Sequence, residues 1–373
     1  RRPLPPAPVA WPSVSLLQPI THGASDLADA LACRAALHYA GRLQHILICD
    51  AGDAQGIALC EAWRARQPAL EIIIVTVTPE VAQDRGARPG GETGQAAVST
   101  KIEKLHAGLP QADGAVLAFV DDDILLRPDA VAGLVRHLQP HLQSPRAGSA
   151  FGLAVYTDWR NVPSGLLSAF VNANALLAYL PLTYLVAPFT ITGHFYALRR
   201  EVFDAIGGLD GMAGRFDDDH ELARRVQAHG LQNVQTPVLY DVDNHLATLN
   251  DYANQMRRWA IIPKQPMAPY LAPRQQAAAL LGSAGNLIPP LLAALALAGR
   301  AAPAPLLGSL ALFAAIYAWC ERRWLRRNTP LRRWPLVLLS TLIAPVQTLA
   351  ALLHGDTFWW RGRRIRLQRG GQY

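Results

Sequence analysis

The stretch AVLAFVDDDILLRP, from Ala115 to Pro128, joins an apolar run to three consecutive carboxylates. Its first six residues are apolar, which is typical of a buried strand. Asp121, Asp122 and Asp123 follow at the carboxyl end of this strand, where adjacent negative charges must be neutralised. A divalent cation, or a metal bound to phosphate, is the usual means. The stretch therefore predicts a metal-nucleotide site at the end of a central strand.

Strand-like and helix-like segments alternate ahead of this stretch. The predicted strands are Val14–Pro19, His45–Cys49 and Glu71–Val77, and the predicted helices are Ser25–Tyr39 and Ala54–Gln67. This alternation is typical of a parallel α/β sheet, whose ligands bind at the carboxyl ends of the strands. Asp50 and Asp53 follow the second strand, so we expect them to face the aspartate triplet across one crevice. The glycine-rich loop Arg85–Gly94 is interpreted as a connection to the helix around Lys101.

The composition indicates a protein associated with membranes. Of 373 residues, 51% are apolar and only 17% charged, and the mean hydropathy is +0.11. After Tyr270 the only acidic residues are Glu321 and Asp356. We therefore expect a catalytic domain over residues 1–265 and a membrane region over residues 266–373. The net charge is +7 and the excess lies near the end of the chain, which suits anionic lipid headgroups and argues against nucleic-acid binding.

The membrane region is predicted to hold two or three apolar helices and a basic tail. The apolar stretches run from about Gln276 to Ala298, from Ala304 to Cys320, and from Leu336 to Leu353. The first is long enough to span ~30 Å of hydrocarbon, and with the second it forms a helical hairpin. The loop after this hairpin, from Glu321 to Trp334, holds six arginines, and the positive-inside rule predicts that it lies in the cytoplasm. Pro345 and Gln347 interrupt the third stretch, which we expect to be re-entrant or interfacial.

Two further segments bear on the membrane. The uncharged run 162–198 also passes a hydropathy filter, but spanning there would separate the triplet from the acids Asp217, Asp218 and Asp219. We therefore interpret it as core helix and strand, with one face against the membrane surface where a lipid acceptor enters. Arg1 and Arg2 precede a proline-rich stretch, a pattern found after the cytoplasmic end of a membrane anchor and also in disordered termini.

Four features in chain order carry a family resemblance. They are the acids Asp50 and Asp53, the triplet, the acids Asp217–Asp219, and the segment QMRRW from Gln255 to Trp259. This order resembles the inverting nucleotide-sugar glycosyltransferases with a D, DxD, D, QxxRW signature. The match is closest to the ceramide glucosyltransferase type, which includes bacterial relatives acting on hopanoids. VSLLQP near the start, ITGHFYALRREVFDAIGGL (191–209) and WWRGRRIRLQRGG (359–371) are also similar to that family.

The resemblance implies a Rossmann-like, GT-A type α/β domain with a mainly parallel sheet, followed by a helical membrane region. It implies that Asp121 and Asp123 hold Mg²⁺ or Mn²⁺ against the diphosphate of a UDP-sugar, with the metal as a Lewis acid. Asp53, or Asp50 in its place, would bind the uridine. Lys101 falls near the donor site by the same matching, although a surface lysine on the charged helix KIEK is an equal alternative.

The remaining motifs supply the acceptor side. Inverting transfer needs one carboxylate to take the proton of the acceptor hydroxyl, and Asp219 matches the family position of that base, with Asp218 beside it. Capping of a helix would also explain acids here, but three in succession exceed what capping requires. Gln255, Arg258 and Trp259 would complete the site, with the arginine at the diphosphate and the indole on the floor of the acceptor pocket.

The leading hypothesis is an integral membrane enzyme with a cytoplasmic catalytic domain, in a bacterial inner membrane. It would move glucose or a related sugar from a UDP-sugar to a hydroxyl of a membrane lipid such as ceramide, a hopanoid or diacylglycerol. A processive polysaccharide synthase shares the four motifs and is the main alternative. A non-catalytic adaptor and a metal-dependent phosphohydrolase are disfavoured by the intact signature. His194, in the TGHF segment, is interpreted as a core or supporting residue.

Overall fold

The computed structural model describes residues 4–24, 26–78, 99–139, 146–215, 217–353, 355–360 and 363–367. Eight of the described strands form one sheet in the order β3-β2-β1-β4-β7-β6-β8-β5. Their bounds are β1 Val14–Pro19, β2 Leu43–Asp50, β3 Glu71–Val77, β4 Val116–Val120, β5 Ile124–Leu126, β6 Ala147–Tyr156, β7 Phe195–Arg199 and β8 Gln232–Val242. β1 to β4 are parallel, β6 and β8 are parallel to each other, and β7 and β5 run antiparallel to their neighbours. The prediction of a mainly parallel α/β sheet is confirmed.

Helices cover the sheet on both faces. In the first half they are α1 Leu27–Ala35, α2 Ala54–Arg66, α3 Lys101–Gly108, α4 Ala130–Leu138, α5 Val162–Asn174, α6 Leu180–Leu185, α7 Arg200–Ala205 and α8 Asp218–Ala228. The rest are α9 Leu249–Ile262, α10 Pro273–Ala284, α11 Ile288–Leu297, α12 Ala304–Cys320 and α13 Trp334–Leu353, followed by the hairpin of β9 Thr357–Trp360 and β10 Arg363–Arg366.

The apolar run of β4 is continuous because both of its faces are buried. Val116, Ala118 and Val120 pack in the cluster that includes α4 and α9, whereas Leu117 and Phe119 pack against α3, α7 and α8. Successive side chains of a strand point to opposite faces, so a strand covered on both sides needs apolar residues at every position. The acids that follow lie at the carboxyl edge of the sheet, at the rim of this double core.

The predicted strands Val14–Pro19 and Glu71–Val77 have the same bounds in the structure. The helix predicted over Ser25–Tyr39 is shorter, since α1 ends at Ala35. Beyond it, His38 N donates to Pro128 O and the Tyr39 hydroxyl donates to Pro12 O, contacts that hold these residues against other segments. The loop Arg85–Gly94 lies outside the described residues.

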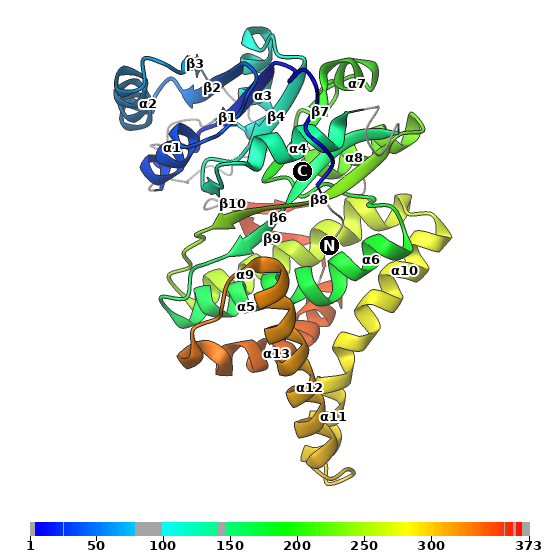
Figure 1. The fold of residues 1–373 in the computed structure, drawn as a ribbon. Helices are drawn as coiled ribbons and strands as arrows, with labels where there is room; N and C mark the ends of the chain where they lie inside the picture. Colours follow the sequence, from blue (N-terminus) through cyan, green and yellow to red (C-terminus); the bar gives the residue numbers. More distant parts are fainter. Residues whose placement is uncertain are drawn as a thin grey trace.

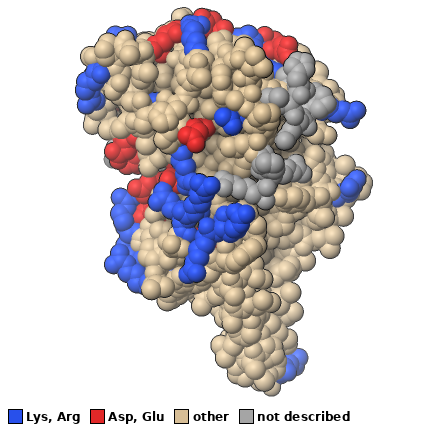
Figure 2. Space-filling view, viewed as in Figure 1, with Lys and Arg blue, Asp and Glu red and all other residues tan. Residues whose placement is uncertain are grey.

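Below the sheet, α5, α9 and α13 form a layer of helices, and α10, α11 and α12 extend away from it (Figure 1). Four described segments are long and apolar enough to cross a membrane: Val162–Leu185, Pro273–Leu297, Ala304–Leu325 and Leu331–Leu353. The α11–α12 hairpin projects beyond the rest of the molecule, and Arg300 near its tip is the only charged residue between 275 and 320. Figure 2 shows Lys and Arg side chains gathered between the sheet and this hairpin.

The third apolar stretch, α13, is tied to the α/β part at both of its ends. Before it, Arg333 donates to Arg160 O, and Arg327 forms an ion pair with Asp241 of β8. After it, Lys264 pairs with Asp356 at 3.0 Å. In its middle, Gln347 accepts a hydrogen bond of 3.0 Å from the Tyr252 hydroxyl of α9. Polar Gln347, which interrupts the apolar pattern, is therefore a contact with the helix that carries QxxRW.

Candidate active site

The carboxyl end of β2 holds its acid through a buried ion pair. Asp50 is 1% exposed and accepts hydrogen bonds from Ser99 N at 2.8 Å and from Lys104 Nζ at 2.7 Å. Lys104 Nζ also donates to Ile20 O at 2.6 Å, at the end of β1. Removing either partner would leave a charge buried without compensation. Both oxygens of Asp50 are thus occupied by the protein itself.

Asp53 occupies the next position along the same edge. Its side chain caps α2 by accepting from Gly56 N at 3.0 Å, and it also accepts from Gly23 N at 3.3 Å. A side-chain oxygen at this place satisfies a helix N–H that has no partner within the helix. Asp53 is 4% exposed, so the loop after β1 lies directly against it.

The side chains of the three aspartates that follow β4 make different contacts. Asp122 points back into the sheet, where it is 7% exposed and accepts from Thr21 N at 2.5 Å. Asp121 faces outward and pairs with Lys101 Nζ at 2.7 Å. Asp123 Oδ1 is buried and has no hydrogen-bond partner among the described residues. Burial raises the pKa values of Asp122 and Asp123 to about 6 each, and neighbouring carboxylates add to both shifts.

Lys101 joins the triplet to the second group of acids. Its Nζ lies 2.7 Å from Asp121 Oδ1, 3.8 Å from Asp218 Oδ2 and 3.1 Å from Gly193 O. Burial lowers the pKa of Lys101, but the charges of Asp121 and Asp218 raise it by more, so that the pKa lies well above its ordinary value. Lys101 itself is 31% exposed, but its ammonium group is paired with Asp121, and Ile102, Lys104 and Leu105 of the same helix are buried.

The three acids that begin α8 have three different environments. Asp217 is 0% exposed and pairs with Arg215 at 3.0 Å. Asp218 faces Lys101, and its Oδ2 has no hydrogen-bond partner among the described residues. Asp219 accepts from His220 N at 2.7 Å and lies against the backbone of Gly193. A Cβ added at Gly193 would come within 2.8 Å of Asp219 Oδ2, so the glycine permits this close approach.

Asp219 has the electrostatics of a general base that works near neutral pH. Burial, and to a smaller extent the adjacent charge of Asp218, raise its pKa to about 7, although the charge of Lys101 opposes this shift. A carboxylate with a pKa near the working pH can accept a proton and still be substantially ionised.

The QxxRW segment on α9 meets the site through aromatic side chains. Trp259 packs edge-on against Tyr156 at 6.2 Å and stacks on Phe170 at 6.4 Å. Tyr156 lies 6.5 Å from the ring of His194, whose carbonyl accepts from Asp121 N at 2.9 Å. The charge of Arg258 acts on both Tyr156 and His194, as does that of Asp121. Gln255 Nε2 is buried and has no hydrogen-bond partner among the described residues.

Three contributors were not found by reading the sequence. Arg34 of α1 is 1% exposed and donates to Ile124 O at 2.7 Å and Asp121 O at 3.2 Å, beneath the triplet. Burial lowers its pKa to about 10, whereas the three aspartates oppose this shift. Lys104 and the turn Thr21–Gly23 are the others. An arginine inside the apolar helix LADALACRA was the available signal for Arg34, because such a residue needs buried acceptors.

The carboxylates can supply part of a metal site. Among the described residues, no group of three His, Cys, Asp or Glu side chains is placed to hold a metal ion. Asp121 and Asp123 are near enough for the charge of Asp121 to raise the pKa of Asp123, and the buried Asp123 Oδ1 lacks a donor among the described residues. Hard oxygen ligands of this kind fit Mg²⁺ or Mn²⁺, provided that a ligand such as a diphosphate and water complete the coordination.

Comparison with known structures places the fold. The mannosyltransferase PcManGT from Pyrobaculum calidifontis, in complex with GDP-Man and Mn²⁺, is 20% identical over 92% of this chain and 89% of that one, with a TM-score of 0.52. S. aureus TarS 1-349 is 12% identical over 97% of this chain and 98% of that one, with a TM-score of 0.41. The similarity to PcManGT indicates that this chain has the same fold as that protein.

Comparison with family models identifies the family. The model described as glycosyl transferase family 21 matches residues 2–373, nearly the whole chain. The expected resemblance to the ceramide glucosyltransferase family is confirmed at this level. The acids at the carboxyl edge of this GT-A-like sheet therefore lie in a protein that belongs to glycosyl transferase family 21.

Proposed function

We propose that this chain is a membrane-bound inverting glycosyltransferase that moves a sugar, in the simplest case glucose, from a UDP-sugar to a hydroxyl of a membrane lipid. The observation that carries the proposal is the position of Lys101, which contacts both Asp121 and Asp218. This contact supports a single site shared by two acid groups that lie almost a hundred residues apart in the sequence. One group has the chemistry to bind a donor diphosphate and the other has the chemistry of a base.

The donor would bind along the edge from β2 to β4. Asp53, beside the turn after β1, is our candidate for the uridine, and Asp50 with Lys104 holds that turn in place. Asp121 and Asp123 would hold Mg²⁺ or Mn²⁺, which supplies charge neutralisation for the leaving diphosphate when bound. The PcManGT complex contains a nucleotide sugar and Mn²⁺, which supports this assignment for a GT-A fold. Arg258, whose charge reaches His194 and Tyr156, is placed to add positive charge beside the diphosphate.

Transfer would proceed by one displacement at the anomeric carbon. Asp219 accepts the proton of the acceptor hydroxyl as the new carbon–oxygen bond forms, and the bond between that carbon and the phosphate oxygen breaks to release UDP. Asp218 raises the pKa of Asp219 and faces Lys101. Gln255 and Trp259, on α9, would complete the site beside the donor, and Trp259 with Tyr156 and Phe170 would form the apolar floor of the acceptor pocket.

The acceptor would enter from the helices beneath the sheet. We assign Val162–Leu185 to the bilayer surface and not to a span, and the contacts of Lys101 with acids that precede and follow this segment support the assignment. The contacts at both ends of α13 favour the same interfacial position for that helix. The spanning element is then the hairpin Pro273–Leu297 and Ala304–Leu325. Six arginines follow it, which places residues 1–265 on the cytoplasmic side.

Mass spectrometry of lipids from cells expressing the chain tests this function. We expect a new hexosyl lipid that disappears with Asp219→Asn, because loss of a general base lowers transfer by roughly 10²–10⁴-fold. UDP release by the purified protein should fall by the same factor. The matched control is Asp204→Asn, which changes an exposed carboxylate on α7 and should leave both signals unchanged. Full activity in Asp219→Asn would contradict the assignment of the base.

Product size distinguishes the processive alternative. A polysaccharide synthase would give a ladder of lengths on a gel or column, whereas a lipid glycosyltransferase gives a lipid that carries a single sugar. The described residues contain one projecting hairpin, and polymer channels usually need more spans than this. A ladder would replace the proposed acceptor without removing the proposed donor site.

A further inference from the structure

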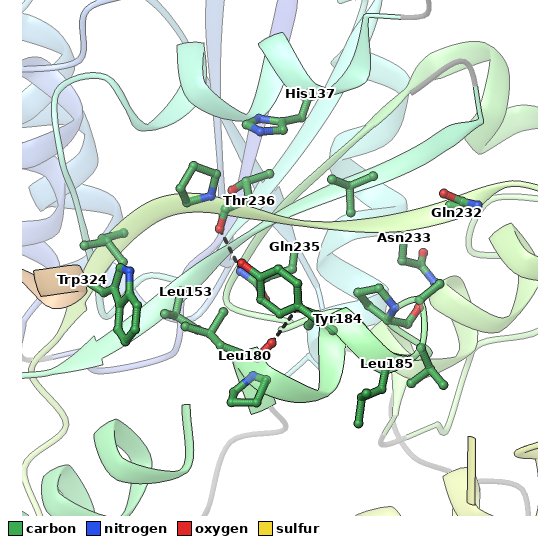
Figure 3. A pocket seen from close by; sticks show the side chains of 18 of the residues that line it. His137, Leu153, Leu180, Tyr184, Leu185, Gln232, Asn233, Gln235, Thr236 and Trp324 are labelled. Atoms are coloured by element: carbon green, nitrogen blue, oxygen red, sulfur yellow. Dashed lines mark hydrogen bonds between the residues drawn. The ribbon is translucent and has the colours of Figure 1, made fainter. Parts of the chain in front are cut away.

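A cavity of about 690 Å³ lies between β8 and the helical segment that contains α6, away from the acids (Figure 3). None of its lining residues among those described is Lys101, Asp121 or Asp219. A volume of this size is typical of sites that enclose a whole ligand. The candidate active site does not account for it.

The walls of the cavity belong to the interface between the sheet and the candidate membrane helices. Leu153 of β6, Leu176, and Leu239 of β8 line it and are buried in one apolar cluster. The same cluster contains Tyr317 and Cys320 of α12 and Val337 of α13. Leu180 and Trp324 also line the cavity and pack against this cluster; Figure 3 shows them on either side of Leu153. The apolar wall is thus continuous with the helices that we assign to the membrane.

The mouth of the cavity lies where those helices begin and end. Tyr184 and Leu185 of α6 are 65% and 55% exposed, and both line the cavity. Leu185 O accepts from Arg274, the second residue of α10, and Trp324 lies in the helical turn Glu321–Leu325 that continues α12. Trp and Tyr are enriched at membrane–water interfaces, because their rings suit the headgroup level. The exposed lining residues Tyr184 and Leu185 therefore lie beside the expected bilayer surface.

The cavity wall also contains a polar atom that could accept a further hydrogen bond. Gln235 Oε1 is buried and has no hydrogen-bond partner among the described residues, whereas Gln235 Nε2 donates to Thr236 O at 3.1 Å. A buried acceptor without a donor is unfavourable, and a ligand hydroxyl or amide would satisfy it. Figure 3 shows Gln235 behind the ring of Tyr184, within the cavity.

We infer that this cavity binds one bilayer lipid, with its acyl chain along Leu153, Leu180 and Trp324 and a hydroxyl or amide near Gln235. This site is separate from the acceptor site of the proposed function. The inference rests on the proposed function only in assuming that the protein is bound to a membrane. The segment 175–180 separates the two sites: Leu176 and Leu180 line the cavity, while the charge of Asp219 acts on Tyr179 between them. Lipid in the cavity would fill the interface between the sheet and the hairpin.

Photocrosslinking tests the inference. The full-length protein is placed in vesicles of phosphatidylglycerol with a trace of a ceramide that carries a diazirine in its acyl chain, and labelled peptides are mapped by mass spectrometry. We expect label on peptides of α6 and of the first half of β8. Leu180→Trp should fill the cavity and lower this label roughly tenfold, equivalent to about 1.4 kcal/mol. Leu307→Trp, at a 64% exposed position of α12, is the matched control and should leave it unchanged.

Thr183→Trp gives a second filling variant from another wall position, should Leu180→Trp fold poorly. Label confined to the hairpin, or label on α6 and β8 that survives both filling variants, would overturn the inference. Asp219→Asn separates the two proposals, because it should abolish transfer while leaving the crosslinks intact. Crosslinks lost in the filled variants together with transfer that persists in Asp219→Asn would support the lipid site and contradict the proposed base.

Discussion

The two groups of acids at the sheet edge differ in how their charge is balanced. Asp50, Asp53 and Asp122 accept hydrogen bonds from backbone N–H groups, and Asp50 also pairs with Lys104. Asp123 and Asp218 each keep a buried oxygen without a hydrogen-bond partner among the described residues. Buried polar groups are normally satisfied, so the exceptions mark places where a ligand or a proton is expected. The acids of the first group are held by the protein itself, whereas Asp123 and Asp218 each keep an oxygen that a ligand or a proton can reach.

The largest effect is expected when the ion pair between Lys104 and Asp50, in the first group of acids, is broken. Lys104→Met leaves the carboxylate of Asp50 buried without its ion pair, and removal of one partner of such a pair costs about 3–5 kcal/mol. We expect a marked fall in the apparent melting temperature of the detergent-solubilised protein, followed by tryptophan fluorescence. The double variant Lys104→Met with Asp50→Asn should recover part of the loss, since no lone charge remains.

Asp218→Asn is the matched test in the other group. It should change the free energy of unfolding by less than about 1 kcal/mol, because Lys101, which lies 3.8 Å from Asp218 Oδ2, keeps its closer ion pair with Asp121. Equal destabilisation by Lys104→Met and Asp218→Asn would remove the distinction between the two groups.

A middle-sized effect is expected at Gly193. The added Cβ of Gly193→Ala would meet Asp219 Oδ2 at 2.8 Å and displace the carboxylate. A displacement of about 1 Å at a reacting group can cost roughly 10²-fold in rate, so we expect kcat to fall by about that factor. Gly308→Ala, where a Cβ meets nothing within 4 Å, is the control. Unchanged kcat in Gly193→Ala would show that the base tolerates movement.

The smallest effect concerns pH. The base must be ionised to accept a proton, so the rate should rise with pH through about 7 and be lost as the carboxylate protonates below that value. Asp218 raises the pKa of Asp219, and Asp218→Asn should therefore move the acidic limb of the profile to lower pH. Initial rates of UDP release across a pH series measure this. An acidic limb that stays in place would mean that another group titrates.

The site illustrates what a sequence pattern can and cannot predict. The alternation of strand and helix predicted that Asp50, Asp53 and the triplet share one edge, because the carboxyl ends of parallel strands meet there. The motif order pointed to Asp219 and to Gln255, Arg258 and Trp259 as further members. It did not predict Arg34 or Lys104, because a buried cation depends on acceptors that lie far away in the sequence. For the same reason the sequence KIEK left open the interpretation of Lys101 as a surface lysine.

The sequence by itself determined the class of fold, the family and the apolar helices, because periodicity, motif order and local hydropathy are properties of neighbouring residues. The tertiary structure decided which carboxylates are occupied and which keep a buried oxygen without a donor. It also decided that Gly193 lies against Asp219, and that the segments at both ends of α13 are held by Arg160 and by Lys264. These outcomes depend on burial and on distances between segments far apart in the chain, which no local pattern encodes.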